Sequence, residues 1–341
     1  MADYDGIPVL PGPPFVGDAV QDDMLPMHIQ SRFRPDVVII LYDLWNFSLP
    51  PHIFDQQMPA DIPVIFWHPV DCDPLDQKER DWLSLGRLMP LAMSEFGKKV
   101  IEADGFGCEY IPHAVDMSVF HPLVDAAQRQ AIRAEFDLAP GQFAVGINGT
   151  TTDALRKGFW EQLAAFAQFR RKHKTAVLMM HTLPRFPGGA DVLAMMKIAG
   201  IPPGAVRFPP PYSYLQGAIP AQTMCAWYNA CDVLSNCTYG EGFGLAAVEA
   251  QACGTPVILS RGSTGEQLAG PGWLVETQPF WNWTHAATWH APQIKAITRA
   301  YEQAYLDAKN RRRAAWKFAA GYSVPVVGPM WEPILKGAVG E

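Results

Sequence analysis

The sequence predicts an α/β protein with two Rossmann-like, doubly wound domains that face each other across a cleft. Short apolar runs alternate with longer amphipathic segments along the 341 residues, which is the pattern of β-α units in a parallel sheet. A Pro-started connection with one expected helix and no strand interrupts this pattern, which places a hinge near 120–125. With 49% hydrophobic residues, the chain is long enough for two cores.

The front half contains four short apolar runs that predict buried strands. They lie at 36–44, 63–67, 88–93 and 109–112. Helices are expected between them at 22–33, 76–86 and 94–104. Ligands of such sheets bind beyond the carboxyl ends of the strands, so polar residues that follow a strand are candidate site residues.

The back half repeats this scheme after a connecting helix at 126–136. Strands are expected at 143–147, 176–181, 206–208, 232–236, 256–260 and 273–276. Helices are expected at 159–173, 190–199, 221–230 and 243–253. The Pro-rich stretch at 208–214 indicates a loop after a strand.

Composition and charge exclude several classes of protein. No apolar run reaches the roughly 18 residues of a membrane span, and the start of the chain has no signal-peptide pattern, so a cytoplasmic protein is expected. The six cysteines form no Cys-x-x-Cys pair, which indicates reduced thiols and no metal bound through sulfur. Up to Pro122 there are 7 Lys and Arg against 19 Asp and Glu, so no nucleic-acid partner is expected.

The basic clusters at 171–174 and 311–313 allow two interpretations. They permit at most a peripheral membrane contact, and a solvated helix face is the commoner explanation.

The stretch YGEGFGLAAVEAQACGTPVIL, residues 239–259, carries the strongest functional signal. Gly242 and Gly244 let a ligand approach the backbone, and a helix expected to begin at Phe243 directs its free N–H groups toward the same space. Glu241 precedes this helix, and Glu249 is expected at the edge of its buried face. Two carboxylates beside an anion pocket suit a ligand that carries hydroxyls on both sides of a diphosphate.

This stretch resembles the Glu-x7-Glu signature of glycosyltransferase family 4, also described as glycosyl transferases group 1, whose retaining enzymes have the GT-B fold. Further blocks at 94–122, 156–169, 228–236 and 263–276 resemble the same family in the same order. The resemblance implies metal-independent transfer of a hexose from a nucleoside-diphosphate sugar to an acceptor, with no cofactor. It also implies a first domain at 1–122, a donor domain at 123–320 and a segment at 321–341 that crosses back to the first domain.

The resemblance assigns roles to individual residues. Glu241 contacts hydroxyls of the transferred sugar, Glu249 holds the ribose, and Arg156 with Lys157 grips the diphosphate. The donor-binding residues that it implies are Asn148, Gly149, Arg156, Lys157, Gly242, Phe243, Gly244, Leu245 and Glu249. The family usually has an arginine soon after the strand at 143–147, where this chain has Asn148 and Gly149, so the second cation stays open.

In the front half, the stretch FWHPVDCDPLD, residues 66–76, follows an expected strand and projects into the predicted cleft. His68 resembles a family histidine near the transferred sugar, although a single histidine at such a place is equally explained by packing. Asp71 and Asp73 are alternative partners for sugar or acceptor hydroxyls. Together they spell Asp-x-Asp, but we expect no metal, because Arg, Lys and a helix dipole can neutralise a diphosphate.

The front half is shorter than that of the family, whose members open with a further β-α-β unit. A strand at 36–44 then has an exposed edge. Either residues 6–10 pair beside residues 37–41, or a second chain covers this edge.

Three functions compete. The first is a retaining hexosyltransferase, and the second is a related phosphorylase or sugar-phosphate synthase. The third is a non-catalytic or partner-dependent nucleotide-sugar-binding protein. A nicotinamide oxidoreductase is disfavoured, because no expected strand is followed by Gly-x-Gly-x-x-Gly.

Overall fold

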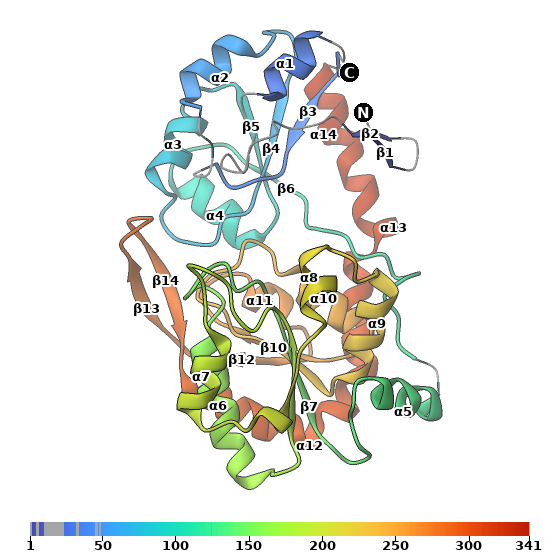
Figure 1. Cartoon of the computed structure of the whole chain (residues 1–341). Coiled ribbons are helices and arrows are strands. Elements are labelled where there is room, and N and C mark those ends of the chain that lie inside the picture. Colours follow the sequence, from blue (N-terminus) through green and yellow to red (C-terminus); the bar gives the residue numbers. More distant parts are fainter. Residues whose placement is uncertain are drawn as a thin grey trace. The chain divides into compact units, whose positions relative to one another are not determined.

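A computed structural model gives the arrangement of the chain (Figure 1). It describes residues 2–4, 7–9, 24–31, 34–44, 47, 49–123 and 125–340. The chain forms two compact units: unit 1 contains Met1–Ile111, Asn282–Ala287 and Met330–Glu341, and unit 2 contains Pro112–Trp281 and Thr288–Pro329. The first change of unit therefore comes earlier than the expected boundary at 122, and the return to unit 1 comes later than the expected residue 321. A cleft between the domains stays a prediction.

Unit 1 contains a parallel sheet of four strands in chain order. The strands are β3 (Val38–Ile40), β4 (Val64–His68), β5 (Leu88–Ala92) and β6 (Glu109–Tyr110). In the register of the sheet, Val38 pairs with Val64, and Val64 pairs with Leu88. Each strand overlaps an apolar run that predicted it, and β4 extends one residue beyond its run, to His68. Parallel strands that neighbour each other in chain order are typical of one half of a doubly wound sheet.

Helices of unit 1 enclose an aromatic core. They are α1 (Met24–Ser31), α2 (Pro51–Gln57), α3 (Gln77–Leu83), α4 (Glu95–Ala103) and α14 (Trp331–Val339). Trp82 of α3 contacts Phe47 and Phe54, with ring centroids 5.0 and 5.1 Å away. Helix α2 lies outside the predicted helices.

The N-terminal residues pair differently from the prediction. Strands β1 (Ala2–Tyr4) and β2 (Ile7–Val9) form an antiparallel pair with each other. The hypothesis that residues 6–10 pair beside residues 37–41 is therefore wrong, because the described part of that segment pairs with β1. Within the described ranges, β3 pairs with β4 alone. Coverage of the β3 edge by a second chain stays a prediction.

Unit 2 contains a six-stranded parallel sheet in the order β12-β11-β10-β7-β8-β9. The strands are β7 (Ala144–Asn148), β8 (Val177–His181), β9 (Val206–Arg207), β10 (Val233–Asn236), β11 (Val257–Ser260) and β12 (Trp273–Val275). From β7, the chain adds strands on one side and then returns to add β10 on the other side. The sheet is therefore doubly wound, and its topological switch point lies between β7 and β10.

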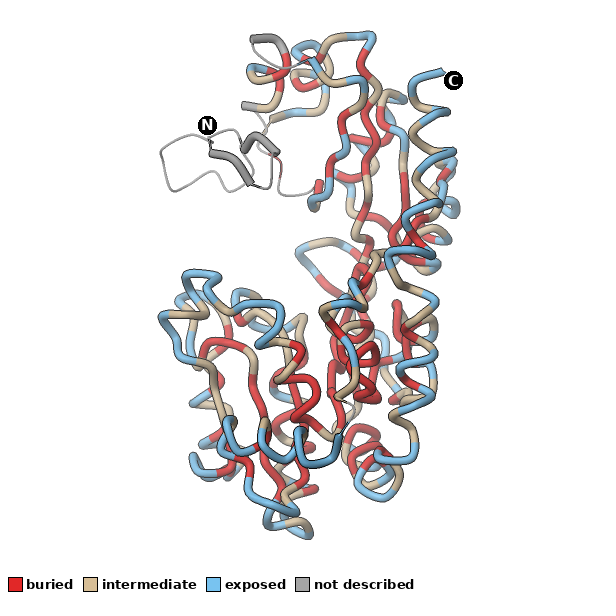
Figure 2. Tube along the Cα trace, turned by 90° about the vertical axis from the view of Figure 1, so that its right-hand side faces the viewer, coloured by how far each residue is buried: buried red, intermediate tan, exposed pale blue. Residues whose placement is uncertain are grey.

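Helices cover this sheet, and buried residues follow its strands (Figure 2). The principal helices are α5 (Ala126–Glu135), α6 (Phe159–Lys172), α7 (Val192–Ala199), α9 (Ala221–Ala230), α10 (Leu245–Ala252) and α12 (Ile294–Ala319). A short helix α8 (Pro211–Leu215) occupies most of the stretch that was predicted as a loop. The hairpin of β13 (Thr277–Asn282) and β14 (Ala287–Pro292) lies outside the predicted elements, as does α12.

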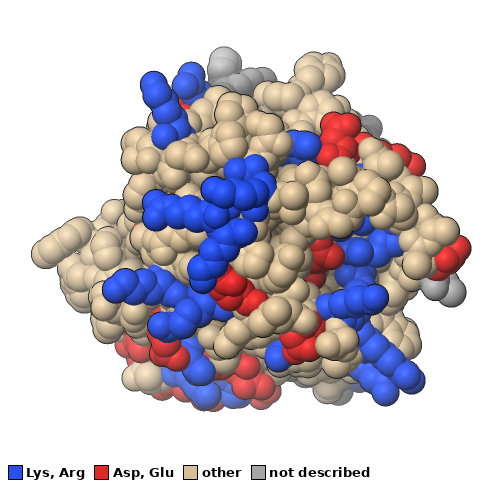
Figure 3. All heavy atoms as spheres, turned by 90° about the horizontal axis from the view of Figure 1, so that it is seen from below, with Lys and Arg blue, Asp and Glu red and all other residues tan. Residues whose placement is uncertain are grey.

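The basic clusters of the second half make internal contacts. Figure 3 shows Lys and Arg side chains gathered on one face of the molecule. Arg311 donates to Asp307 over 2.7 Å and to the carbonyl of Gly272 over 3.0 Å, and Lys172 pairs with Glu302 at 3.3 Å. These contacts favour a structural role for the clusters, and a peripheral membrane contact stays a prediction. Among the described helices, none combines the length and the apolar character that crossing a bilayer requires.

Candidate functional site

Polar residues of unit 2 gather at the switch point of its sheet. Asn148 ends β7 and His181 ends β8, and these two residues are register partners. Asn236 ends β10, and the loop that follows it leads to Glu241. Because the carboxyl ends of parallel strands meet at one edge of the sheet, these residues converge where doubly wound sheets bind ligands.

Glu241 lies between two cations of the loop that precedes α6. Its Oε2 accepts a 2.7 Å bond from Lys157 Nζ, and its Oε1 lies 3.9 Å from Arg156 Nη1. Burial raises the pKa of Glu241, but the charges of Lys157 and Arg156 outweigh burial and hold it below its ordinary value. The backbone of this loop is fixed by Gly158, whose φ is 56° and where a Cβ would lie 2.3 Å from the carbonyl oxygen of Cys237.

Helix α10 begins next to this ion pair. Gly244 is its N-cap residue, with a φ of 101° that favours glycine, and the helix starts at Leu245, two residues later than predicted. The first N–H groups of a helix have no helical partner, so they can bind an anion. Phe243, the residue before this N-cap, is only 3% exposed. Glu241 and Gly244 line a cavity of about 10 Å³, enough for about one water molecule.

Glu249 of α10 belongs to a chain of hydrogen bonds that ends at His181. Tyr228 Oη donates to Glu249 Oε2 over 2.7 Å, and Asn148 Nδ2 donates to Tyr228 Oη over 2.8 Å. Asn148 Oδ1 lies 2.9 Å from His181 Nδ1. Burial raises the pKa of Glu249, and the bond from Tyr228 offsets only part of this rise.

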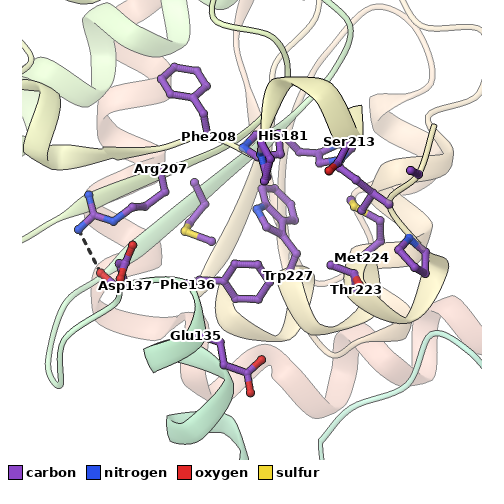
Figure 4. A pocket seen from close by; sticks show the side chains of 16 residues that line it. Glu135, Phe136, Asp137, His181, Arg207, Phe208, Ser213, Thr223, Met224 and Trp227 are labelled. Carbon is purple, nitrogen blue, oxygen red and sulfur yellow. Dashed lines mark hydrogen bonds between the residues drawn. The ribbon is translucent and has the colours of Figure 1, made fainter. Parts of the chain in front are cut away.

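His181 also lines a cavity of about 410 Å³ beside β8 and β9 (Figure 4). Aromatic rings of Phe136, Phe208 and Trp227 contribute to its wall, together with Arg207 and Ser213. The ring of His181 packs against Trp227 and Tyr214, with centroids 5.9 and 5.1 Å away. A cavity of this size with aromatic rings and several polar side chains in its wall suits a planar ring system that carries polar groups.

The candidate residues of unit 1 have different surroundings. His68 ends β4, is 0% exposed, and its Nε2 lies 2.8 Å from Oε1 of the buried Glu79. Of the two explanations for His68, these contacts favour packing, because the side chain has no accessible surface in this conformation. A role of His68 next to the transferred sugar stays a prediction. Asp71 is half-buried in the loop after β4, and Asp73 is exposed. In the part of the chain that the structure describes, no three His, Cys, Asp or Glu side chains gather as metal ligands. Metal independence stays a prediction.

The structure thus brings together most of the predicted donor-binding residues in unit 2. Arg156 and Lys157 meet Glu241, and Asn148 joins Glu249 through Tyr228. Tyr228 and His181 were not among the predicted site residues. His181 could have been found from its place at the carboxyl end of an expected strand, whereas no local pattern marks Tyr228.

Comparisons with known proteins find similarity over a part of the chain that includes Glu241 and Glu249. Residues 156–286 match the profile of a protein family described as "Glycosyl transferases group 1". Over 161 residues, the chain is 30% identical to a D-inositol 3-phosphate glycosyltransferase of Arthrobacter sp. (strain FB24). That alignment covers 47% of this chain and 35% of the relative, so the chain matches about a third of the length of this curated protein.

Two solved structures share the fold over nearly the whole chain. Sucrose-phosphate synthase from Thermosynechococcus elongatus has a TM-score of 0.70 at 17% identity, covering 96% of this chain and 81% of that protein. Anabaena HepE, solved in complex with UDP and glucose, has a TM-score of 0.67 at 14% identity, covering 92% and 80%. At these identities the likeness concerns the fold alone: an α/β architecture with parallel sheets, as in GT-B glycosyltransferases.

Proposed function

We propose that this protein is a retaining glycosyltransferase that moves a hexose from a nucleoside-diphosphate sugar to an acceptor hydroxyl without a metal ion. The observation that carries the proposal is the position of Glu241, which Lys157 and Arg156 hold next to the N-terminus of α10. This arrangement combines two cations, a helix terminus and a carboxylate at the switch point of a doubly wound sheet.

A diphosphate would bind where these groups meet. Lys157 and Arg156 supply positive charge and N–H donors, and the first turn of α10 supplies further N–H groups. When the diphosphate shares the two cations, Glu241 can accept hydrogen bonds from hydroxyls of the transferred sugar. The same cations would stabilise the charge on the departing diphosphate as the sugar–phosphate bond breaks.

The transfer step itself needs no covalent residue of the protein. The acceptor oxygen forms a bond to the anomeric carbon as the bond to the phosphate oxygen breaks on the same face of the sugar. The acceptor proton passes to the departing phosphate, so that the configuration at the anomeric carbon is retained. In this scheme, the protein orients donor and acceptor and stabilises charge.

The nucleoside would extend from the diphosphate toward the 410 Å³ cavity. Glu249 lies one turn into α10, where its carboxylate can accept hydrogen bonds from the ribose hydroxyls. The chain through Tyr228 and Asn148 connects Glu249 to His181 in the cavity wall. Arg207 and Ser213 also line this cavity, and we propose that the base of the donor binds in it.

The proposal is tested first by binding and then by turnover. UDP-, GDP- and ADP-glucose are compared by thermal shift, and the best ligand is assayed for hydrolysis and transfer with a series of sugar acceptors. We expect one nucleotide sugar to raise the melting temperature. Lys157→Ala and Glu249→Ala should abolish most of this shift, whereas Glu276→Ala should preserve it, because Glu276 makes an exposed ion pair with Arg261. No shift with any nucleotide sugar would refute the proposal.

A second function, donor binding without transfer, is favoured by the burial of His68. Unit 1 offers no accessible histidine at this strand end, since His68 is enclosed and paired with Glu79. Binding of a nucleotide sugar by the wild type, with no hydrolysis and no transfer in an acceptor series, would support this function. Turnover that Glu249→Ala removes would exclude it.

A further inference from the structure

In the chain of hydrogen bonds from Glu249 to His181, each group has a fixed role as donor or acceptor. The carboxylate of Glu249 sets these roles. A carboxylate can only accept hydrogen bonds, so the 2.7 Å contact with Tyr228 uses the single proton of the phenol. Burial keeps this proton in place, because it raises the pKa of Tyr228 well above 10. Tyr228 Oη is therefore an acceptor toward its other neighbour.

That neighbour is the side-chain amide of Asn148. Only the NH₂ group of an amide can donate, so Nδ2 faces Tyr228 Oη at 2.8 Å. The oxygen of the same amide then faces His181 Nδ1 at 2.9 Å. Because this oxygen can only accept, His181 must carry a proton on Nδ1.

The other nitrogen of His181 is consequently an acceptor. Burial lowers the pKa of His181, so the imidazole is neutral near pH 7, and a neutral ring protonated on Nδ1 has its free lone pair on Nε2. Nε2 is shielded from solvent and has no hydrogen-bond partner in the part of the chain that the structure describes. A buried acceptor without a partner destabilises the free protein, and a ligand that donates to it removes this penalty.

We propose that His181 Nε2 accepts a hydrogen bond from an N–H group on the Watson–Crick edge of the donor base. His181 would thus determine specificity for the base, and the inference rests on the proposed function. The ring is suited to this role because it lines the 410 Å³ cavity together with Trp227 (Figure 4). It also packs against both Trp227 and Tyr214, and these contacts restrict its orientation. The base N–H that it reads is N3 of uracil, N1 of guanine or N6 of adenine.

The inference predicts that a methyl group on this nitrogen prevents tight binding. A site that satisfies a buried polar atom through the ligand rejects an analogue that lacks the matching group. Isothermal titration calorimetry would compare UDP with N3-methyl-UDP. If GDP or ADP binds better than UDP, the comparison uses N1-methyl-GDP or N6,N6-dimethyl-ADP. We expect methylation to weaken binding to the wild type by at least about tenfold.

His181→Phe keeps an aromatic ring and removes the acceptor. In this variant, the parent nucleotide and its methylated analogue should bind with similar dissociation constants. His173→Phe is the matched control, because His173 lies in the same unit and pairs with Glu302 outside the cavity. It should preserve the discrimination of the wild type. Circular dichroism and thermal melting would verify that both variants fold, and if His181→Phe does not fold, the comparison of nucleotides on the wild type decides.

Three outcomes would overturn the inference. The first is equal binding of both nucleotides by the wild type, and the second is discrimination that persists in folded His181→Phe. The third is a wild type that discriminates against a 2′-deoxy nucleotide instead of the methylated base and loses this discrimination in His181→Phe, which would assign His181 to the ribose. All of these require that a nucleotide binds, whereas failure of the proposed function would appear as no binding of any nucleotide.

Discussion

At the residue scale, two glutamates of one motif have opposite electrostatic surroundings. Burial raises the pKa of both Glu241 and Glu249. Lys157 and Arg156 reverse this effect at Glu241, whereas Glu249 has only the neutral hydroxyl of Tyr228 to stabilise its charge. As the pH falls, Glu249 therefore binds a proton before Glu241 does.

This order predicts how donor binding depends on pH. A raised pKa means that Glu249 is protonated at pH values where an ordinary glutamate, with a pKa of 4.5, is still ionised. A protonated carboxyl accepts hydrogen bonds from ribose hydroxyls less well. As the pH is lowered, affinity for the best-binding nucleotide sugar should therefore begin to fall before pH 4.5 is reached. Calorimetry from pH 4.5 to 8 measures this fall.

Glu249→Gln provides the comparison. Its neutral side chain should bind the donor more weakly at pH 8, and the difference from the wild type should shrink as the pH falls. This comparison also separates Glu249 from His181, which gains charge in the same direction and is present in both proteins. A constant ratio of the two dissociation constants across the pH range would contradict the assignment of Glu249.

The sequence predicted single residues well where a local motif carried them. Glu241, Gly244 and Glu249 belong to one contiguous stretch, and the structure places them around one helix terminus. The sequence could not predict that Tyr228 donates a hydrogen bond to Glu249, because this contact depends on how α9 packs beside α10. The sequence also left open whether His68 packs or contacts a ligand, because it could not show that Glu79 of the following helix lies next to this strand end.

At the element scale, Gly244 determines how α10 begins. Its φ of 101° is strained for any residue with a Cβ, and an added Cβ would lie 3.2 Å from Leu268 Cδ1. Gly141 also has a positive φ, 77°, but an added Cβ there has no atom within 4 Å. Substitution of Gly141 therefore tests backbone strain alone, whereas substitution of Gly244 tests strain together with a shift of the helix start.

We expect Gly141→Ala to lower the free energy of unfolding by about 1–2 kcal/mol through strain alone. Gly244→Ala should cost more, because Leu268 must also move, and should weaken nucleotide-sugar binding by roughly tenfold as the helix terminus shifts. Urea unfolding and calorimetry measure the two effects. Equal donor affinity in the two variants would show that the start of α10 does not position the donor.

Elements with a strong apolar signal were predictable, and those with a weaker signal were not. Strands such as β4 and β8 are nearly continuous apolar runs, which is typical of strands buried in a parallel sheet. The long helix α12 buries mainly alanines, such as Ala300 and Ala304, whose weak hydrophobic signal conceals the period. The β13–β14 hairpin lacks a buried apolar run that would have marked it, because its strand β13 is largely exposed.

At the scale of the whole molecule, each unit has a core of its own. The core of unit 1 contains Phe54, Phe66 and Trp82, and that of unit 2 contains Phe166 and Tyr301. All the residues that we assign to the donor belong to unit 2. The two units can therefore open separately, and a nucleotide that binds unit 2 should stabilise that unit alone.

Hydrogen–deuterium exchange of the full chain tests this separation. With the nucleotide at one hundred times its dissociation constant, amides of β7, β8 and β10 should gain protection equivalent to about 2.7 kcal/mol. Amides of β4 and β5 in unit 1 should exchange at unchanged rates, because their opening leaves the nucleotide site intact. Equal protection of both sets would contradict separate opening, since it would mean that the two cores unfold as one cooperative unit.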